Sequence, residues 1–262
     1  MKLFFNIFGL KIPAYGFFAA LGILVVLVYL KRQRIYKTLD FDTALSGLLY
    51  ALVAGGIGAK VLYWITDPSS LAILFDKGYP FMERLQMTFS GGMVFLGGLI
   101  GGLVGTLLFL YQYKLETLRT LDIFAVGLPI LQMFGRMGCF FAGCCYGQRT
   151  NSCIGVVFPE GSLAPSGVPL IPTQLFGVAG NLLLVAYLLF YTRKTRESGK
   201  VMGWYLVLYS IGRFILEFFR GDEIRGLYGS LSTSQWISIP LLAMGLFLLF
   251  WKGKRELYLK RG

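Results

Sequence analysis

The stretch Leu121 to Ala142, LDIFAVGLPILQMFGRMGCFFA, is an almost continuous apolar run. A helix needs about 20 such residues to cross a hydrocarbon core of about 30 Å, and this run is long enough. The chain of 262 residues is 56% hydrophobic and only 15% charged, which is too apolar for a soluble domain of this size. Further runs of the same kind occupy residues 13–30, 43–65, 91–111, 173–191, 203–219 and 235–251. We therefore expect an all-α membrane protein with seven transmembrane helices.

The connections between these runs are short, which leaves little chain for a separate soluble domain. Residues 1–262 are therefore expected to form a single polytopic transmembrane domain. The first run resembles a cleaved signal peptide in hydrophobicity, but its basic residues follow the run and no A-x-A site closes it. We expect this run to remain as the first helix.

The net charge of +12 alternates between loops, which argues against a nucleic-acid-binding patch. Basic residues gather after the first, third, fifth and last runs: Lys31, Arg32, Arg34, Lys37, Lys114, Arg119, Arg193, Lys194, Arg196, Lys200, Lys252, Lys254, Arg255, Lys260 and Arg261. The opposite loops are poorer in basic residues and mixed in sign. Because basic loops stay in the cytoplasm, we expect the N-terminus outside and the C-terminus inside, in the inner membrane of a bacterium, and no nucleic acid as partner.

The spans are predicted to contain the ionisable residues Lys60, Arg136, Arg213 and Glu217. A charge at the bilayer centre costs roughly 2.5 to 3.5 kcal/mol on insertion scales, so these side chains are expected to face the bundle interior. One interpretation is structural, because Arg213 and Glu217 at i and i+4 can form an ion pair on one helical face. The other is functional, which is the usual role of charge inside a membrane.

An arginine cluster is predicted at the outer leaflet. Tyr209, Arg213 and Glu217 recur every four residues and so line one stripe of a helix, which Arg220 continues toward the outer surface. The predicted topology places Arg136 at the same leaflet. The guanidinium fork matches phosphate oxygens in a bidentate manner, and the bilayer supplies phosphates at that depth. The residues therefore predict a phospholipid headgroup site.

All four cysteines fall in one short stretch: Cys139, Cys144, Cys145 and Cys153. Three interpretations compete: disulfides on the oxidising face of the membrane, ligands of a soft metal, or small buried residues without special chemistry. The spacing C-x4-C-C-x7-C is not a standard zinc pattern and the chain has no histidine, so no metal or cofactor is expected. We favour one outer-loop disulfide over buried thiols, without assigning its pairing.

Glycines crowd residues 91–105, among them Gly97 and Gly98. Close packing of helices explains most glycines in such a pattern, and room for a lipid chain or headgroup is the alternative. A soluble phosphate-binding loop is excluded, because no Lys-Ser or Lys-Thr follows these glycines.

The segment Gly135-Arg136-Met137-Gly138-Cys139-Phe140, followed by Gly143 and Gly147, resembles the G-R-x-G-N-F-x-N-x-E-x-x-G motif of the prolipoprotein diacylglyceryl transferase family. Further blocks resemble those of the family in the same order along most of the chain: Tyr15-Gly16, Gly58-Ala59-Lys60, the glycine-rich segment from Gly91 to Gly101, Pro172-Thr173-Gln174-Leu175, Tyr209 to Arg220 (YSIGRFILEFFR), Ser234-Gln235 and Ser238-Ile239-Pro240.

The resemblance implies an enzyme that moves the diacylglyceryl group of phosphatidylglycerol onto the lipobox cysteine thiol of a prolipoprotein and releases glycerol phosphate. By their positions in the motifs, Arg136 and Arg213 would hold the phosphate, Tyr15 and Tyr209 would line the site, and Glu217 would orient Arg213 or take part in proton balance. The residues implied in substrate binding are Arg136, Arg220, Lys60, Gly97, Gly98, Gly138, Cys139, Gly147 and Gln174.

The chain departs from the family where the motifs have His, Asn or Glu, at Leu96, Cys139, Ala142, Cys144, Ile171 and Gly177. A histidine base is impossible in a chain without histidine, which leaves Glu217, Tyr209 or hydroxide as conceivable proton acceptors. Two other functions therefore stay open: a related lipid transferase with a different donor or acceptor, and a non-catalytic membrane protein that binds or moves phospholipid.

Overall fold

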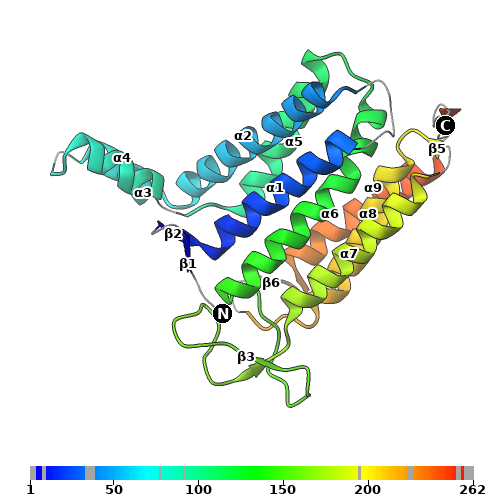
Figure 1. Ribbon diagram of the computed structural model, residues 1–262. Coiled ribbons are helices and arrows are strands. Elements are labelled where there is room, and N and C mark those ends of the chain that lie inside the picture. The colour runs from blue at the N-terminus through cyan, green and yellow to red at the C-terminus, as the bar shows by residue number, and fades with distance from the viewer. Residues whose placement is uncertain are drawn as a thin grey trace. The chain divides into compact units, whose positions relative to one another are not determined.

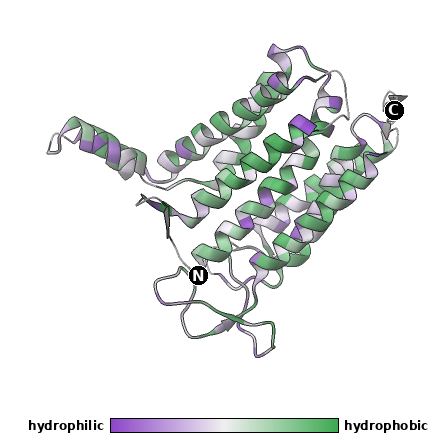
Figure 2. Ribbon diagram, viewed as in Figure 1, coloured by the Kyte–Doolittle hydropathy of each residue, from purple (hydrophilic) through white to green (hydrophobic). Residues whose placement is uncertain are grey.

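The computed structural model describes residues 4–7, 10–32, 39–76, 78–90, 92–193, 196–222, 227–251 and 255–256. Helices dominate this part of the chain, and its strands form short antiparallel pairs (Figure 1). The chain folds as two compact units, one made of Met1–Lys37 with Leu118–Gly262 and the other of Thr38–Thr117. The long helices are hydrophobic along most of their length (Figure 2). This composition suits a lipid solvent, in which each helix satisfies its own backbone hydrogen bonds.

The first unit is built on the long helices α1 (Ala14–Arg32), α6 (Thr117–Ala142), α7 (Thr173–Tyr191), α8 (Lys200–Glu217) and α9 (Thr233–Phe250). Its strands pair as β1 (Phe4–Ile7) with β2 (Leu10–Pro13), β3 (Val156–Val157) with β4 (Pro169–Leu170), β5 (Arg196–Glu197) with β8 (Arg255–Glu256), and β6 (Leu227–Tyr228) with β7 (Leu231–Ser232). Helix α8 packs against both α7 and α9. The start of α9 is fixed by a capping box, in which Ser232 and Gln235 satisfy each other's backbone N–H groups.

The second unit contains α2 (Phe41–Thr66), α3 (Pro68–Ala72), the 3-10 turn η1 (Ile73–Phe75), α4 (Phe81–Ser90) and α5 (Phe95–Gln112). Helices α2 and α5 make the most extensive contact in this unit. The short elements α3, η1 and α4 connect them. Asp40 begins α2, because its carboxylate accepts a hydrogen bond from the Thr43 backbone N–H at 3.4 Å.

Glycine allows the backbones of α2 and α5 to touch. A Cβ atom added to Gly101 would lie 2.2 Å from the Ala54 carbonyl oxygen, and one added to Gly105 would lie 2.5 Å from that of Tyr50. A Cβ on Gly97 would lie 2.3 Å from the Gly58 carbonyl oxygen. As the α5 residue number rises, the α2 residue number falls, so the two helices are antiparallel. Helix packing therefore accounts for these glycines, as the sequence pattern predicts.

Five described helices are long and apolar enough to cross a membrane: α1, α2, α6, α7 and α9. They correspond to five of the seven predicted runs, so the chain is a multi-pass membrane protein. The other two runs also form helices, α5 and α8, but these are less clear as spans. In α5 the apolar segment whose side chains are described runs from Leu96 to Gln112. This segment is shorter than the five helices above. Helix α8 carries three charged residues, Lys200, Arg213 and Glu217.

The beginning of α8 is held by contacts with α6 and α9. At its beginning, the buried carboxylate of Asp122 in α6 accepts hydrogen bonds from the backbone N–H groups of Gly199 at 2.7 Å and Met202 at 2.8 Å. Lys200 in turn donates to the Leu249 carbonyl at the end of α9, at 2.7 Å. Asp122 was not among the ionisable residues expected inside the spans. Its acidic side chain compensates the positive end of the α8 dipole, which explains how a carboxylate can be buried there.

Substituting Gly101 with alanine should destabilise the α2–α5 pair. The added methyl group would overlap the Ala54 carbonyl, and such overpacking costs about 1 to 3 kcal/mol of unfolding free energy. Denaturant unfolding of the purified protein in detergent measures the change. Gly56→Ala is the matched control in α2, because a Cβ on Gly56 meets no atom within 4 Å. Equal stability of the two variants would contradict the packing argument.

Candidate active site

A buried ion pair lies at the end of α8, where the stripe of charged residues was predicted. The Arg213 Nη2 atom lies 2.9 Å from Glu217 Oε2, and the Glu217 side chain is 1% exposed. Arg213 Nη2 also donates a hydrogen bond to Ser234 Oγ in the first turn of α9, at 2.6 Å. The predicted i, i+4 pair is therefore confirmed. Ser234 extends it to a second helix.

Arg220 joins the same carboxylate from the segment that follows α8. Its Nη1 atom lies 3.5 Å from Glu217 Oε2, so one carboxylate oxygen faces two guanidinium groups. Arg220 also binds both carboxylate oxygens of Asp222, with Nε donating to Oδ1 at 2.8 Å. Burial alone would lower the pKa of Arg220, but the hydrogen bonds and charge of Asp222 outweigh it and raise this pKa above its ordinary value. Arg220 therefore stays charged.

Three backbone segments meet around Gly147 and fix the position of Arg220. The Gln148 N–H donates to the Phe219 carbonyl at 2.9 Å, and the Gly221 N–H donates to the Tyr146 carbonyl at 3.1 Å. A Cβ atom on Gly147 would lie 2.6 Å from the Ile171 carbonyl oxygen and 2.8 Å from that of Phe219. The structure thus gives Gly147 a packing role at the crossing of these segments. Its expected role in substrate binding stays a prediction.

Arg136 lies in α6, close to α7. A Cβ atom added to Gly177 in α7 would lie 3.2 Å from the Arg136 side chain, so the family's Glu at this position would crowd it. Arg136 and Arg220 lie within electrostatic range of Arg213. Within the described part of the chain, Arg136 makes no hydrogen bond or ion pair, and the buried Nη1 atom of Arg213 has no hydrogen-bond acceptor.

Among the described residues, the arginine cluster therefore has cationic capacity to spare. Glu217 contacts Arg213 and Arg220, and Asp222 contacts Arg220, whereas Arg136 and the Nη1 atom of Arg213 have no anionic partner in this part of the chain. Buried cations without full compensation are costly, and an anion that enters the site would relieve that cost. The donor geometry of guanidinium suits phosphate. The cluster can thus receive one phosphate group.

Two tyrosines expected in the site take different positions in the first unit. Tyr15 in α1 packs on Gly138 in α6, where an added Cβ would lie 2.9 Å from the tyrosine ring. The Tyr15 side chain is otherwise half exposed, so its hydroxyl is accessible. Tyr209 in α8 stacks on Tyr205, with ring centroids 5.6 Å apart. Gly138 is therefore required for the approach of α1 to α6.

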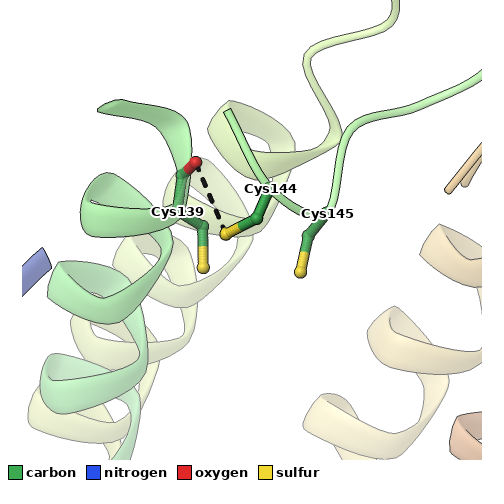
Figure 3. A group of neighbouring side chains, drawn as sticks. All are labelled: Cys139, Cys144 and Cys145. Carbon is green, nitrogen blue, oxygen red and sulfur yellow. Dashed lines mark hydrogen bonds between the residues drawn. The ribbon is translucent and has the colours of Figure 1, made fainter. Parts of the chain in front are cut away.

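Three of the four cysteines form a cluster at the end of α6 (Figure 3). The sulfur atoms of Cys139, Cys144 and Cys145 all lie within 4.8 Å of one another. Cys153 is exposed, and all four thiols are free, so the expected outer-loop disulfide is not formed in the structure. Gln174 is fully buried beside the cluster and donates to the Cys144 carbonyl at 2.8 Å.

The remaining expected site residues lie in the second unit. Lys60 in α2 is buried, and its Nζ donates to the Gly92 carbonyl at 3.4 Å. Its ammonium group also lies 4.9 Å from the centre of the Tyr63 ring, a cation–π contact. Gly97 and Gly98 face the backbone of α2. The site roles of Lys60 and these glycines stay predictions.

Two partners of the arginines, Ser234 and Asp222, were not anticipated from the sequence. Ser234 carries no charge, and Asp222 lies in one of the loops that are mixed in sign. Asp222 follows Arg220 by two residues, and this spacing was one signal for their contact. The loop conformation that brings the Asp222 carboxylate back to the Arg220 guanidinium cannot be read from the sequence. Cys145 was likewise recognised only as a member of a cysteine-rich stretch.

Comparison with known proteins gives the same family along nearly the whole chain. A family model described as prolipoprotein diacylglyceryl transferase matches residues 2–251. A phosphatidylglycerol–prolipoprotein diacylglyceryl transferase 2 of Clostridium perfringens (strain 13 / Type A) is 44% identical over 246 residues, which cover 93% of this chain and 92% of the relative. The transferase of Clostridium tetani (strain Massachusetts / E88) is 37% identical over 248 residues, covering 93% and 94%. That of Chlorobaculum tepidum is 31% identical over 268 residues, covering 96% and 89%.

Replacing Glu217 with glutamine should destabilise the protein. The amide keeps the shape of the side chain but removes the negative charge between Arg213 and Arg220, and breaking such a buried pair costs about 3 to 5 kcal/mol. Denaturant unfolding in detergent measures the loss. Glu160→Gln, at an exposed position, should change stability by no more than about 0.5 kcal/mol. A Glu217→Gln variant as stable as this control would refute the compensating role of the carboxylate.

Proposed function

The chain belongs to the prolipoprotein diacylglyceryl transferase family, and we propose that it transfers the diacylglyceryl group of phosphatidylglycerol to the lipobox cysteine thiol of prolipoproteins. In this reaction the bond between the glyceryl carbon and the phosphate oxygen breaks, and a carbon–sulfur bond forms. The bonding electrons leave with glycerol phosphate, and the thiol loses its proton. The substrates are thus one membrane lipid and one exported precursor with a lipobox signal peptide.

The single observation that carries this proposal is the arginine cluster with its spare cationic capacity. Negative charge grows on the departing phosphate as the carbon–oxygen bond breaks. In this proposal Arg136 and the free Nη1 atom of Arg213 stabilise that charge, because preorganised donors aimed at developing charge lower the barrier. Glu217 and Ser234 hold Arg213 in position. The residues proposed to stabilise the leaving group are therefore ones that this chain shares with the family's motifs.

Other residues take supporting roles in this proposal. Tyr15 supplies an accessible hydroxyl beside Gly138, and Arg220 holds the outer edge of the cluster. The buried Gln174 carbonyl oxygen accepts no hydrogen bond from the described residues and offers an acceptor for a hydroxyl group of the lipid. The chain has no histidine, so the thiol proton leaves to Glu217, Tyr209 or hydroxide.

The proposal includes seven membrane-spanning helices in one transmembrane domain, with the N-terminus outside and the C-terminus in the cytoplasm. Helices α5 and α8 are the two spans added to the five clear ones. Within α8 the three charged residues lie near its ends, Lys200 at one and Arg213 with Glu217 toward the other, so the centre of the helix is apolar. This orientation places the arginine cluster at the outer face of the inner membrane, where exported precursors arrive.

The activity test uses the purified full chain in mixed micelles. With phosphatidylglycerol and a lipobox peptide, the wild-type protein should form a thioether-linked diacylglyceryl peptide that mass spectrometry detects. Arg136→Ala should lower the rate by about 100- to 1,000-fold, the usual cost of losing one donor to developing negative charge. Arg149→Ala, an exposed arginine of the same outer region, is the matched control and should keep the wild-type rate.

Three results separate the alternatives for the activity. Absence of thioether product with every phospholipid would refute the proposal. Turnover of another lipid or acceptor, without this product, would support a related transferase, and lipid binding without turnover would support a non-catalytic protein. Complementation of a cell depleted of its own transferase provides an independent test.

Reporter fusions test the orientation. Alkaline phosphatase fused after Glu160 should be active, because this loop is expected outside the cytoplasm, where the enzyme forms its disulfides. The same reporter fused after Lys114 should be inactive. Reversed activities would exclude the proposed orientation, and activity at both positions would contradict the single span, α6, between them.

A further inference from the structure

The three-cysteine cluster is not explained by the arginine site. Cys139 lies in the last turn of α6, whereas Cys144 and Cys145 follow the end of that helix. Two residues with left-handed backbone conformation, Gly143 with φ 76° and Cys145 with φ 56°, turn the chain back over the helix end. The sulfur atoms of all three side chains project to the same side of this turn (Figure 3). The fold thus gathers three thiols that the sequence spacing does not suggest.

The turn is held in this conformation by α7. Thr173 Oγ1 donates a hydrogen bond to the Cys145 carbonyl at 2.7 Å, and Gln174 Nε2 donates to the Cys144 carbonyl at 2.8 Å. Both carbonyls are therefore occupied. A cysteine with positive φ is strained, and such strain persists only where surrounding contacts enforce it. The convergence of the thiols is thus built into the fold.

Three converging thiols match the ligand set of a soft cation. Thiolates select Zn²⁺ and Cu⁺ over harder ions, and a Zn–S bond of about 2.3 Å in tetrahedral geometry separates two sulfurs by about 3.8 Å. The three sulfurs already lie within 4.8 Å of one another, so small side-chain rotations suffice to reach that spacing. Arg136 and Arg220 lie within electrostatic range of Cys145 and can offset the negative charge of the thiolates.

We propose that Cys139, Cys144 and Cys145 bind one thiophilic cation of the Zn²⁺ class through three thiolates, with the fourth position open. The three thiol protons are released to solvent on binding. This inference departs from the expectation of no metal, which rested on linear spacing and the absence of histidine. It concerns binding alone and does not rest on the proposed function.

The binding test uses the full chain in detergent, reduced and then freed of metal with a chelator. Titration with Cd²⁺, a spectroscopic probe for Zn²⁺, should give thiolate-to-metal charge-transfer absorption that saturates at one equivalent. Each of Cys139→Ser, Cys144→Ser and Cys145→Ser should weaken binding by more than the roughly 10- to 100-fold cost of losing an outer-shell partner. Cys153→Ser is the matched control and should bind as the wild type does, because Cys153 lies outside the cluster.

A second measurement covers the case in which a serine variant fails to fold. Alkylation of the wild-type protein should modify all four cysteines without metal and Cys153 alone when Zn²⁺ is bound, as mass spectrometry of peptides would show. Absence of saturable binding would overturn the proposal, as would equal binding by Cys153→Ser and the three cluster variants. A disulfide between two cluster cysteines in the protein as isolated would also overturn it. None of these results depends on lipid transfer.

Discussion

The carboxylate of Glu217 is the charge on which the candidate site depends. It lies between two guanidinium groups, and burying either arginine without this carboxylate would be costly. In the described part of the chain, neither Glu217 nor Asp222 contacts Arg136 or the Nη1 atom of Arg213. These donors can therefore bind an anionic ligand.

The helical architecture was largely predictable, because apolar length and charge decide which segments suit lipid. Close packing of α5 on another helix was also predictable, since glycines spaced along α5 leave its backbone open to a neighbouring helix. Helices α5 and α8 show the limit of that reasoning. In α8 the same charged residues that form the site lower the hydropathy by which a span is recognised.

The candidate site was predictable only where its residues lie on one helix. Arg213 and Glu217 share a helical face by spacing alone, and the structure confirms their contact. Ser234, Asp222 and the cysteine turn depend on how chain segments far apart in sequence meet. The order of residues along the chain does not show which distant segments meet. Asp122 is a related case, because a buried carboxylate gains its partners only when α8 begins beside α6.

Hydrogen bonds near both ends of α8 limit how this helix can move. Asp122 of α6 fixes its first turn, and Ser234 of α9 holds Arg213 near its last. Sliding by one helical turn, about 5.4 Å along the axis, would break both attachments at once. A gate that worked by piston motion of α8 is therefore disfavoured. Entry of a lipid headgroup is better served by rearrangement of side chains around a stationary α8, so turnover need not displace this helix.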